Sequence, residues 1–204
     1  MPGLPAQASG ARPAARSALS EHQLRAALVT ASDLPHGWAR DGDAGQAQDG
    51  APTTYEPASC GAIFTTLAPG AGTSLPSVAA SYSRGGPEGA RLDMSITAFP
   101  GLEAATRLRR VSAALPRCAR VRAGTGGDAV GLSVTPLAFP TMGEQVQALR
   151  VTVTGAGAGS VSDAVLAARD GALVVFVSDG PHPIPGPELQ ALVRAGLGRL
   201  ARFA

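Results

Sequence analysis

Apolar side chains recur along this chain at two spacings, one typical of helices and the other of strands. Spacings of three and four residues predict helices over 21–32, 60–67, 102–115 and 186–203. Alternation of apolar and polar residues, or a short apolar run, predicts strands over 78–84, 90–99, 129–135, 147–154, 160–169 and 172–178. The predicted order of elements is therefore α-α-β-β-α-β-β-β-β-α.

Local signals support several of these elements. Ser20 and Gln23 form a capping-box pattern at the start of the first helix. Asp170-Gly171, between the last two strands, is a typical type I′ hairpin turn. The run 173–177 is apolar at every position, which predicts a central strand covered on both faces.

Connections between the strands are mostly short enough for hairpins, and crossovers are few. This favours the α+β class, with an antiparallel β-sheet of about six strands and flanking helices on at least one face. Residues 20–204 are expected to form a single domain. Residues 1–19 are rich in Pro and Ala without any apolar period, so we interpret them as a flexible linker. Such a linker often follows a removed signal, a lipidated cysteine or a membrane helix, and we expect a membrane anchor N-terminal to it.

Charge and hydropathy exclude two classes of protein. The 204 residues include 17 basic residues, all arginine, and 15 acidic ones, for a net charge of +2. That balance does not fit a dedicated nucleic-acid binder, and no apolar run approaches the ~18 residues of a membrane span. The densest basic stretch is a solvated helix face with the loop after it, or alternatively an anion-binding patch, and we favour the first. It contains Arg107, Arg109, Arg110, Arg117, Arg120 and Arg122.

The two cysteines, Cys60 and Cys118, do not form a zinc motif, and the histidines His22, His36 and His182 are scattered. We therefore expect no metal and no cofactor. The cysteines are either two buried thiols or one disulfide. We predict the disulfide Cys60–Cys118, because closing so long a loop adds substantial stability. A disulfide implies an oxidising, extracytoplasmic compartment.

Candidate chemistry is sparse. The glycine-rich segments 124–127 and 155–159 lack the strand-then-helix context of a phosphate loop. A Ser-His-Asp triad could assemble only from isolated histidines, so we assign no catalytic residue. Arg84, Arg91 and Asp93 lie on adjacent predicted strands. They form either a cross-strand ion pair, which we favour, or the floor of a ligand-binding cleft.

The stretch 28–38 contains Asp33-Leu34-Pro35 and Gly37-Trp38. It resembles the "L-x-x-x-DLP-x-GW" opening of actinobacterial extracytoplasmic sensor domains, including the PknH-like domain of receptor Ser/Thr kinases and related lipoproteins. The two cysteines and the segment 168–175 are similar as well. The resemblance covers about residues 20–203 and implies an antiparallel sheet with flanking helices and a cleft, held outside the membrane. PknH-like domains typically carry two disulfides, whereas this chain can form one.

Together these features lead us to expect a non-enzymatic extracytoplasmic sensor or ligand-binding domain, tethered to the membrane and associated with the cell envelope, or else secreted. Its partner would be an unknown small molecule or cell-envelope ligand. The alternative is a carrier of an apolar small molecule or lipid, and a hydrolase ranks below both. A polar cleft bordered by Arg84, Arg91 and Asp93 would favour the sensor. A large apolar cavity would favour the carrier, and a hydrogen bond between a serine and a histidine would favour the hydrolase.

Overall fold

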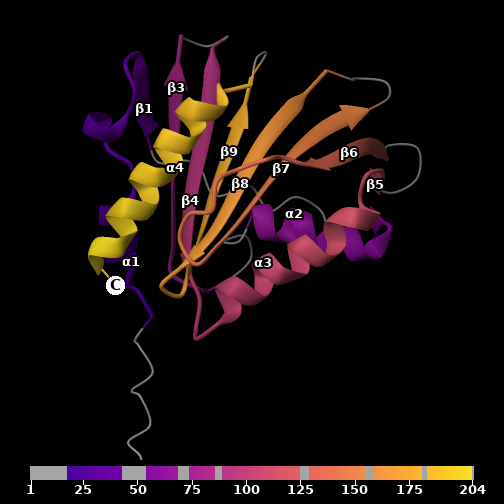
Figure 1. Ribbon diagram of the computed structural model, residues 1–204, viewed down its shortest axis with the longest axis horizontal. Coiled ribbons are helices and arrows are strands. Elements are labelled where there is room, and N and C mark those ends of the chain that lie inside the picture. Colours follow the sequence, from indigo (N-terminus) through magenta and orange to yellow (C-terminus); the bar gives the residue numbers. More distant parts are fainter. Residues whose placement is uncertain are drawn as a thin grey trace, which may run out of the picture.

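The computed structural model describes residues 18–42, 54–68, 74–85, 89–124, 129–154, 159–180 and 183–203. Within them, helices flank a nine-stranded antiparallel sheet of order β1-β3-β4-β9-β8-β7-β6-β5-β2 (Figure 1). The helices are α1 (Glu21–Ala27), α2 (Gly61–Leu67), α3 (Glu103–Ala114) and α4 (Gly186–Leu200). The strands are β1 (Trp38–Gly42), β2 (Tyr55–Glu56), β3 (Ser77–Arg84), β4 (Ala90–Ala98), β5 (Val121–Ala123), β6 (Val130–Pro136), β7 (Gln145–Thr154), β8 (Val161–Arg169) and β9 (Ala172–Asp179).

The α+β class is confirmed, but the expected number of about six strands is wrong. The three additional strands, β1, β2 and β5, are five, two and three residues long and lie towards the edges of the sheet. Segments this short do not carry a readable alternation, and pairing with a longer neighbour decides their conformation. The central position of β9, between β4 and β8, is as predicted. The turn before it has φ of 51° at Asp170 and 76° at Gly171, as a type I′ turn requires.

The first helix ends earlier than its apolar spacing predicts. The structure has α1 to Ala27 and then an extended residue, instead of a helix to about residue 32. Leu28 and Val29 turn into the core, and the Val29 carbonyl accepts a hydrogen bond from the buried Tyr82 hydroxyl at 2.8 Å. A tertiary contact therefore overrides the local helical pattern. Of the predicted linker, only residues 18 and 19 are described, and Leu19 is buried in the same core.

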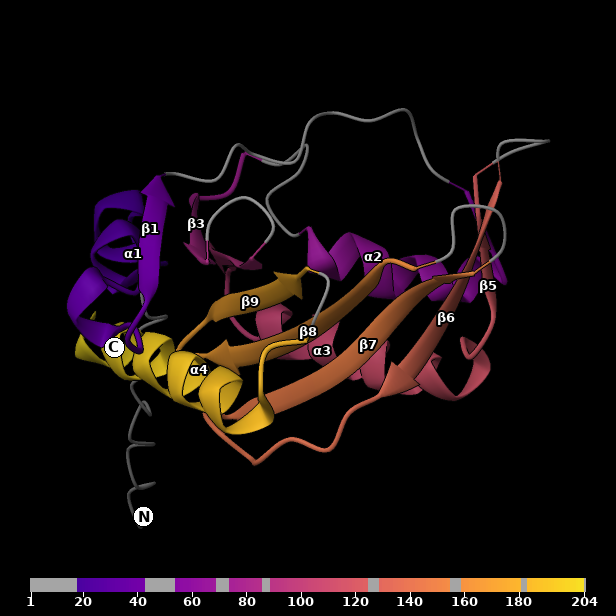
Figure 2. The same cartoon turned by 90° about the horizontal axis from the view of Figure 1, so that it is seen from above.

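Two apolar clusters cover the two faces of the sheet. One lies under α1 and α4, and the other lies under α2 and α3; Figure 2 shows α4 and α3 on opposite sides. A Cβ at Gly196 of α4 would lie 2.8 Å from Phe176 and 2.9 Å from Met94, so glycine allows α4 to approach β9 and β4 closely. On the other face, α3 packs over β7, β8 and β9. In the described part of the chain, no helix has the length and apolar character to cross a membrane.

The helix pairs thus cover different parts of the sheet. On the α1/α4 side, the part formed by β5, β6 and the end of β7 lies away from α4. On the α2/α3 side, β3 and β4 lie beyond the strands over which α3 packs. Successive strands of a sheet are rotated relative to one another, so a straight helix follows only some of them. Both outlying parts carry polar side chains.

The predicted disulfide is present. Cys60 and Cys118 are bonded, and both are fully buried in the cluster under α2 and α3. Cys60 directly precedes α2, and Cys118 lies between α3 and β5. The bond therefore fastens the start of α2 to the segment that leads into β5.

Candidate ligand-binding site

Polar side chains occupy the α2/α3 side of the sheet over β1, β3, β4 and β9. We call this set the polar face; it consists of Asp41, Ser81, Ser83, Arg91, Asp93 and Asp179. Strand register brings five of them, all except Asp41, together in two rows. In the first row Arg91 lies opposite Ser83 on one side and Asp179 on the other, and in the second Ser81 lies opposite Asp93.

Alternation along the strands explains how this face arises. In β3 and β4 the intervening residues, such as Tyr82, Leu92 and Met94, point to the other side and are buried under α1 and α4. Their neighbours must therefore point away from that core. Ser81, Ser83 and Asp93 are only half-buried, in keeping with their place beyond the strands that α3 covers.

Each carboxylate of the polar face accepts a hydrogen bond from a serine hydroxyl on a neighbouring strand. Ser83 donates to Asp41 at 2.6 Å, Ser81 donates to Asp93 at 2.5 Å, and Ser162 donates to Asp179. Each pair keeps free lone pairs on the carboxylate and on the hydroxyl. With three carboxylates and one guanidinium, the face offers mainly acceptors and a few strong donors. That combination suits a ligand with several hydroxyl groups.

The structure brings only two of the three predicted cleft residues together. Arg91 and Asp93 belong to the polar face, but Arg84 points to the opposite side of the sheet, because it is one residue out of phase with Ser83. Arg84 Nη1 donates to Glu188 of α4 at 2.5 Å, and its guanidinium lies 5.2 Å from the centre of the Trp38 ring. Trp38 Nε1 donates to the same Glu188 carboxylate oxygen. Arg84 therefore links β1 and β3 to α4 through its contacts with Trp38 and Glu188.

Asp33, which belongs to the motif that carries the family resemblance, also attaches the N-terminal part of the domain to α4. Asp33 accepts hydrogen bonds from the backbone and hydroxyl of Thr30 at 2.9 and 2.6 Å, and from Arg199 of α4 at 3.2 Å. The Thr30 hydroxyl bond is the main cause that holds the pKa of Asp33 below its usual value of 3.8. Together with Trp38, this residue attaches the start of the chain to α4.

Sequence reasoning missed Asp41, Ser81, Ser83 and Asp179. Ser81 and Ser83 alternate with apolar residues in β3, so a period-two reading of 77–84 could have found them. Asp179 lies one residue beyond the predicted end of its strand. Asp41 lies on the short edge strand β1, for which the sequence carries no signal.

Other candidate chemistry is placed as follows. On α3, Arg107 and Arg110 face Glu103 at 3.2 and 3.8 Å, which fits a solvated helix face. In the described part, His22 and His36 are exposed, and neither takes part in a hydrogen bond. His182 and most of both glycine-rich segments lie outside the described residues. Among the residues that are described, no three His, Cys, Asp or Glu side chains are grouped so as to hold a metal ion.

The fold and this site define an α+β domain with a helix-flanked antiparallel sheet and a polar sheet face. Among solved structures, the extracellular domain of PknH from Mycobacterium tuberculosis has the same fold, with a TM-score of 0.65 and 15% identity over 91% of this chain and 98% of that one. The PknH-like resemblance is thus confirmed for the fold. An uncharacterised protein from Mycobacterium smegmatis is also similar, with a TM-score of 0.48 and 14% identity over 88% and 94%. No protein-family model matches the chain, and no curated protein does.

Proposed function

We propose that this chain is a non-enzymatic, extracytoplasmic sensor or ligand-binding domain, with the polar face as its binding site. The fold that it shares with the PknH extracellular domain supports this proposal. The buried disulfide Cys60–Cys118 supports an oxidising compartment. Tethering through a segment N-terminal to the domain completes the proposal. The observation that carries the proposal is the polar face, a group of hydroxyls and carboxylates on the outlying part of the sheet.

The chemistry of the polar face favours a polyhydroxylated ligand, such as a saccharide of the cell envelope. The carboxylates of Asp93 and Asp179 accept hydrogen bonds from ligand hydroxyls, and the Arg91 guanidinium donates to ligand oxygens. Hydrogen bonds to charged groups contribute about 1.5–3 kcal/mol each, so three of them correspond to binding in the millimolar to micromolar range. The neighbouring strands β3, β4 and β9 hold these groups at fixed spacing.

An apolar ligand fits this face less well. Covering Asp93 and Asp179 with hydrocarbon would remove water from two carboxylates without giving them new partners, which costs several kcal/mol. The carrier of a lipid or other apolar molecule is therefore the alternative against which the proposal is tested.

The test is calorimetric titration of the chain with soluble glycans, namely trehalose, N-acetylglucosamine oligomers and galactan fragments, and with dodecanoic acid as the apolar probe. We expect at least one glycan to bind, and Asp93→Asn and Arg91→Gln to weaken it by about tenfold. Arg109→Gln, an exposed arginine on α3 away from the face, is the matched control and should leave binding unchanged.

Three results would contradict the proposal. Glycan binding that survives both substitutions would place the site elsewhere. Binding of dodecanoic acid alone would favour the carrier. Release of shorter glycans during the titration, detected by mass spectrometry, would make the protein a hydrolase.

A further inference from the structure

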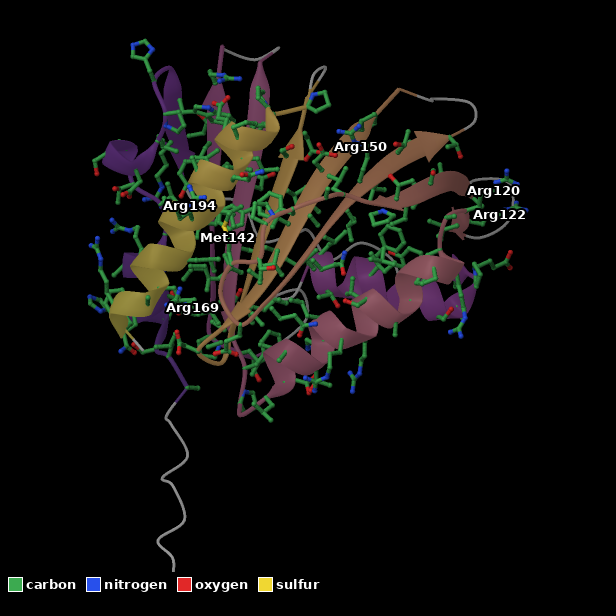
Figure 3. All side chains as sticks on the ribbon, viewed as in Figure 1. Arg120, Arg122, Met142, Arg150, Arg169 and Arg194 are labelled. Carbon is green, nitrogen blue, oxygen red and sulfur yellow. A yellow bond between two sulfur atoms is a disulfide. The ribbon has the colours of Figure 1, made fainter. Side chains whose placement is uncertain are left out.

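A second polar region lies at the other end of the sheet, on its α1/α4 side. It is an open groove of about 590 Å³ beside β5, and Arg120, Arg122, Ser133 and Thr154 line it together with Glu56. Figure 3 shows Arg120 and Arg122 next to each other at this end of the sheet, away from α4. Volumes of about 300–1,000 Å³ are typical of small-molecule sites.

The sequence around β5 puts both arginines on the same side. Val121 and Ala123 are buried, and Val121 belongs to the cluster under α2 and α3. Alternation therefore turns Arg120 and Arg122 to the opposite face, where both are exposed. Cys118 precedes Arg120 by two residues, so the disulfide holds the start of this edge in place.

The floor of the groove is open because of a glycine. Gly131 of β6 lies between Arg122 of β5 and Thr154 of β7 in the register. A Cβ at Gly131 would lie 2.5 Å from the Thr154 hydroxyl, so any side chain here would collide with it. Without that side chain, the Arg122 guanidinium and the Thr154 hydroxyl share one open row of the sheet.

The groups in this groove match the chemistry of an oxyanion. A guanidinium presents paired N–H donors in a plane that fits two oxygens of a phosphate or sulfate. The hydroxyls of Ser133 and Thr154 add neutral donors on the neighbouring strands. Glu56 lies opposite Arg122 in the β2–β5 pair, and its single negative charge leaves the groove with a net positive charge. The polar face, with its three carboxylates, has the opposite charge, so an anion is directed to the groove.

We propose that this groove binds a small molecule that carries a phosphate or sulfate group, with Arg120 and Arg122 as the oxyanion ligands. The remaining volume accommodates an organic part, such as a sugar or a lipid head group. This site is separate from the polar face and does not depend on the function proposed for it. Under this proposal Arg120 and Arg122 form an anion-binding patch, whereas the arginines of α3 belong to a solvated helix face.

The test is titration of the ¹⁵N-labelled protein, followed by amide chemical shifts. The probes are inorganic phosphate, glucose 6-phosphate and short-chain phosphatidic acid below its micelle concentration. We expect saturable shifts at Gly131, Ser133 and Thr154, and affinity that falls as salt is added. Arg120→Gln and Arg122→Gln should each weaken binding by about tenfold. Preference for glucose 6-phosphate indicates a soluble phosphate ester, and preference for phosphatidic acid indicates a lipid head group.

Arg109→Gln and Arg110→Gln are matched controls, because both remove one exposed arginine from α3. Circular dichroism and the melting temperature establish that every variant is folded. The proposal is overturned if none of the probes gives saturable shifts. It is also overturned if the α3 variants weaken binding as much as Arg120→Gln does, since the attraction would then reflect only overall charge.

Discussion

Breaking the disulfide should remove a large part of the stability of this domain. Cys60 and Cys118 are 58 residues apart in sequence, and in the chain-entropy relation such a loop contributes about 4 kcal/mol by restricting the unfolded chain. The closed loop includes β3 and β4, which lie on the far side of the sheet from β5. The constraint therefore acts on the pairing of strands that are distant in space. Because domains of this size have about 5–15 kcal/mol of net stability, the loss is large.

Urea unfolding measures the effect. The oxidised protein is compared with Cys118→Ala, with Cys60→Ala and with the double variant, all followed by far-UV circular dichroism. With a slope of about 2 kcal/mol per molar urea, we expect the midpoint to fall by about 2 M in each variant. Either single substitution already breaks the bond, so the double variant should be nearly as stable as the singles.

Two outcomes would refute this reasoning. A loss below about 1 kcal/mol in both single variants would mean that the bond does not limit the unfolded chain as the entropy relation requires. Additive losses, with the double variant about twice as unstable as each single one, would mean that the effect comes from packing around each sulfur. Reduction of the unaltered protein before unfolding is the control, since it breaks the bond without changing any side chain.

Three further predictions concern the attachments of α4. Glu188→Ala leaves the buried Trp38 indole N–H without its acceptor and should lower the free energy of unfolding by about 2 kcal/mol in urea. Because the pKa of Asp33 is lowered in the folded protein, its ionised carboxylate stabilises the fold above pH 3.8. The free energy of unfolding should therefore differ most between the unaltered protein and Asp33→Asn at neutral pH, and this difference should narrow as the pH falls below 3.8. A difference that stays constant with pH would contradict this prediction. Gly196→Ala should lower the melting temperature, whereas Gly198→Ala, with nothing within 4 Å, should raise it.

The two polar regions lie apart because each helix pair covers a different part of the sheet. Each helix pair covers strands that are central on its own face, and the outlying strands differ between the faces. Asp41, Asp93 and Asp179 gather on one outlying part, and Arg120 and Arg122 on the other. The two groups are separated by the core and by most of the width of the sheet. The hydroxyl-rich ligand and the anionic ligand that we propose would therefore bind at separate places.

Much of the fold follows from the sequence because its signals are local. The apolar periods of α3 and α4, the alternation in β4, the type I′ turn at Asp170 and the uninterrupted apolar run in β9 each act within a few residues. The segment 28–38 suggested a PknH-like domain, and the similarity of the whole fold to the PknH extracellular domain agrees with it. The disulfide could be predicted over two buried thiols because closing so long a loop adds substantial stability, and the structure confirms it.

Three features depend on the tertiary structure and could not be predicted from the sequence. They are the presence of the short edge strands, the early end of α1 and the set of residues that come together in the polar face. β1, β2 and β5 exist because longer strands offer them unpaired backbone groups, and α1 ends where Leu28 and Val29 find partners in the core. Arg84 and Arg91 look equivalent in the sequence, yet the register of β3 and β4 sends them to opposite faces, one to Glu188 and the other to the polar face. A one-residue difference in phase reverses the face of a side chain, and only the pairing of strands sets that phase.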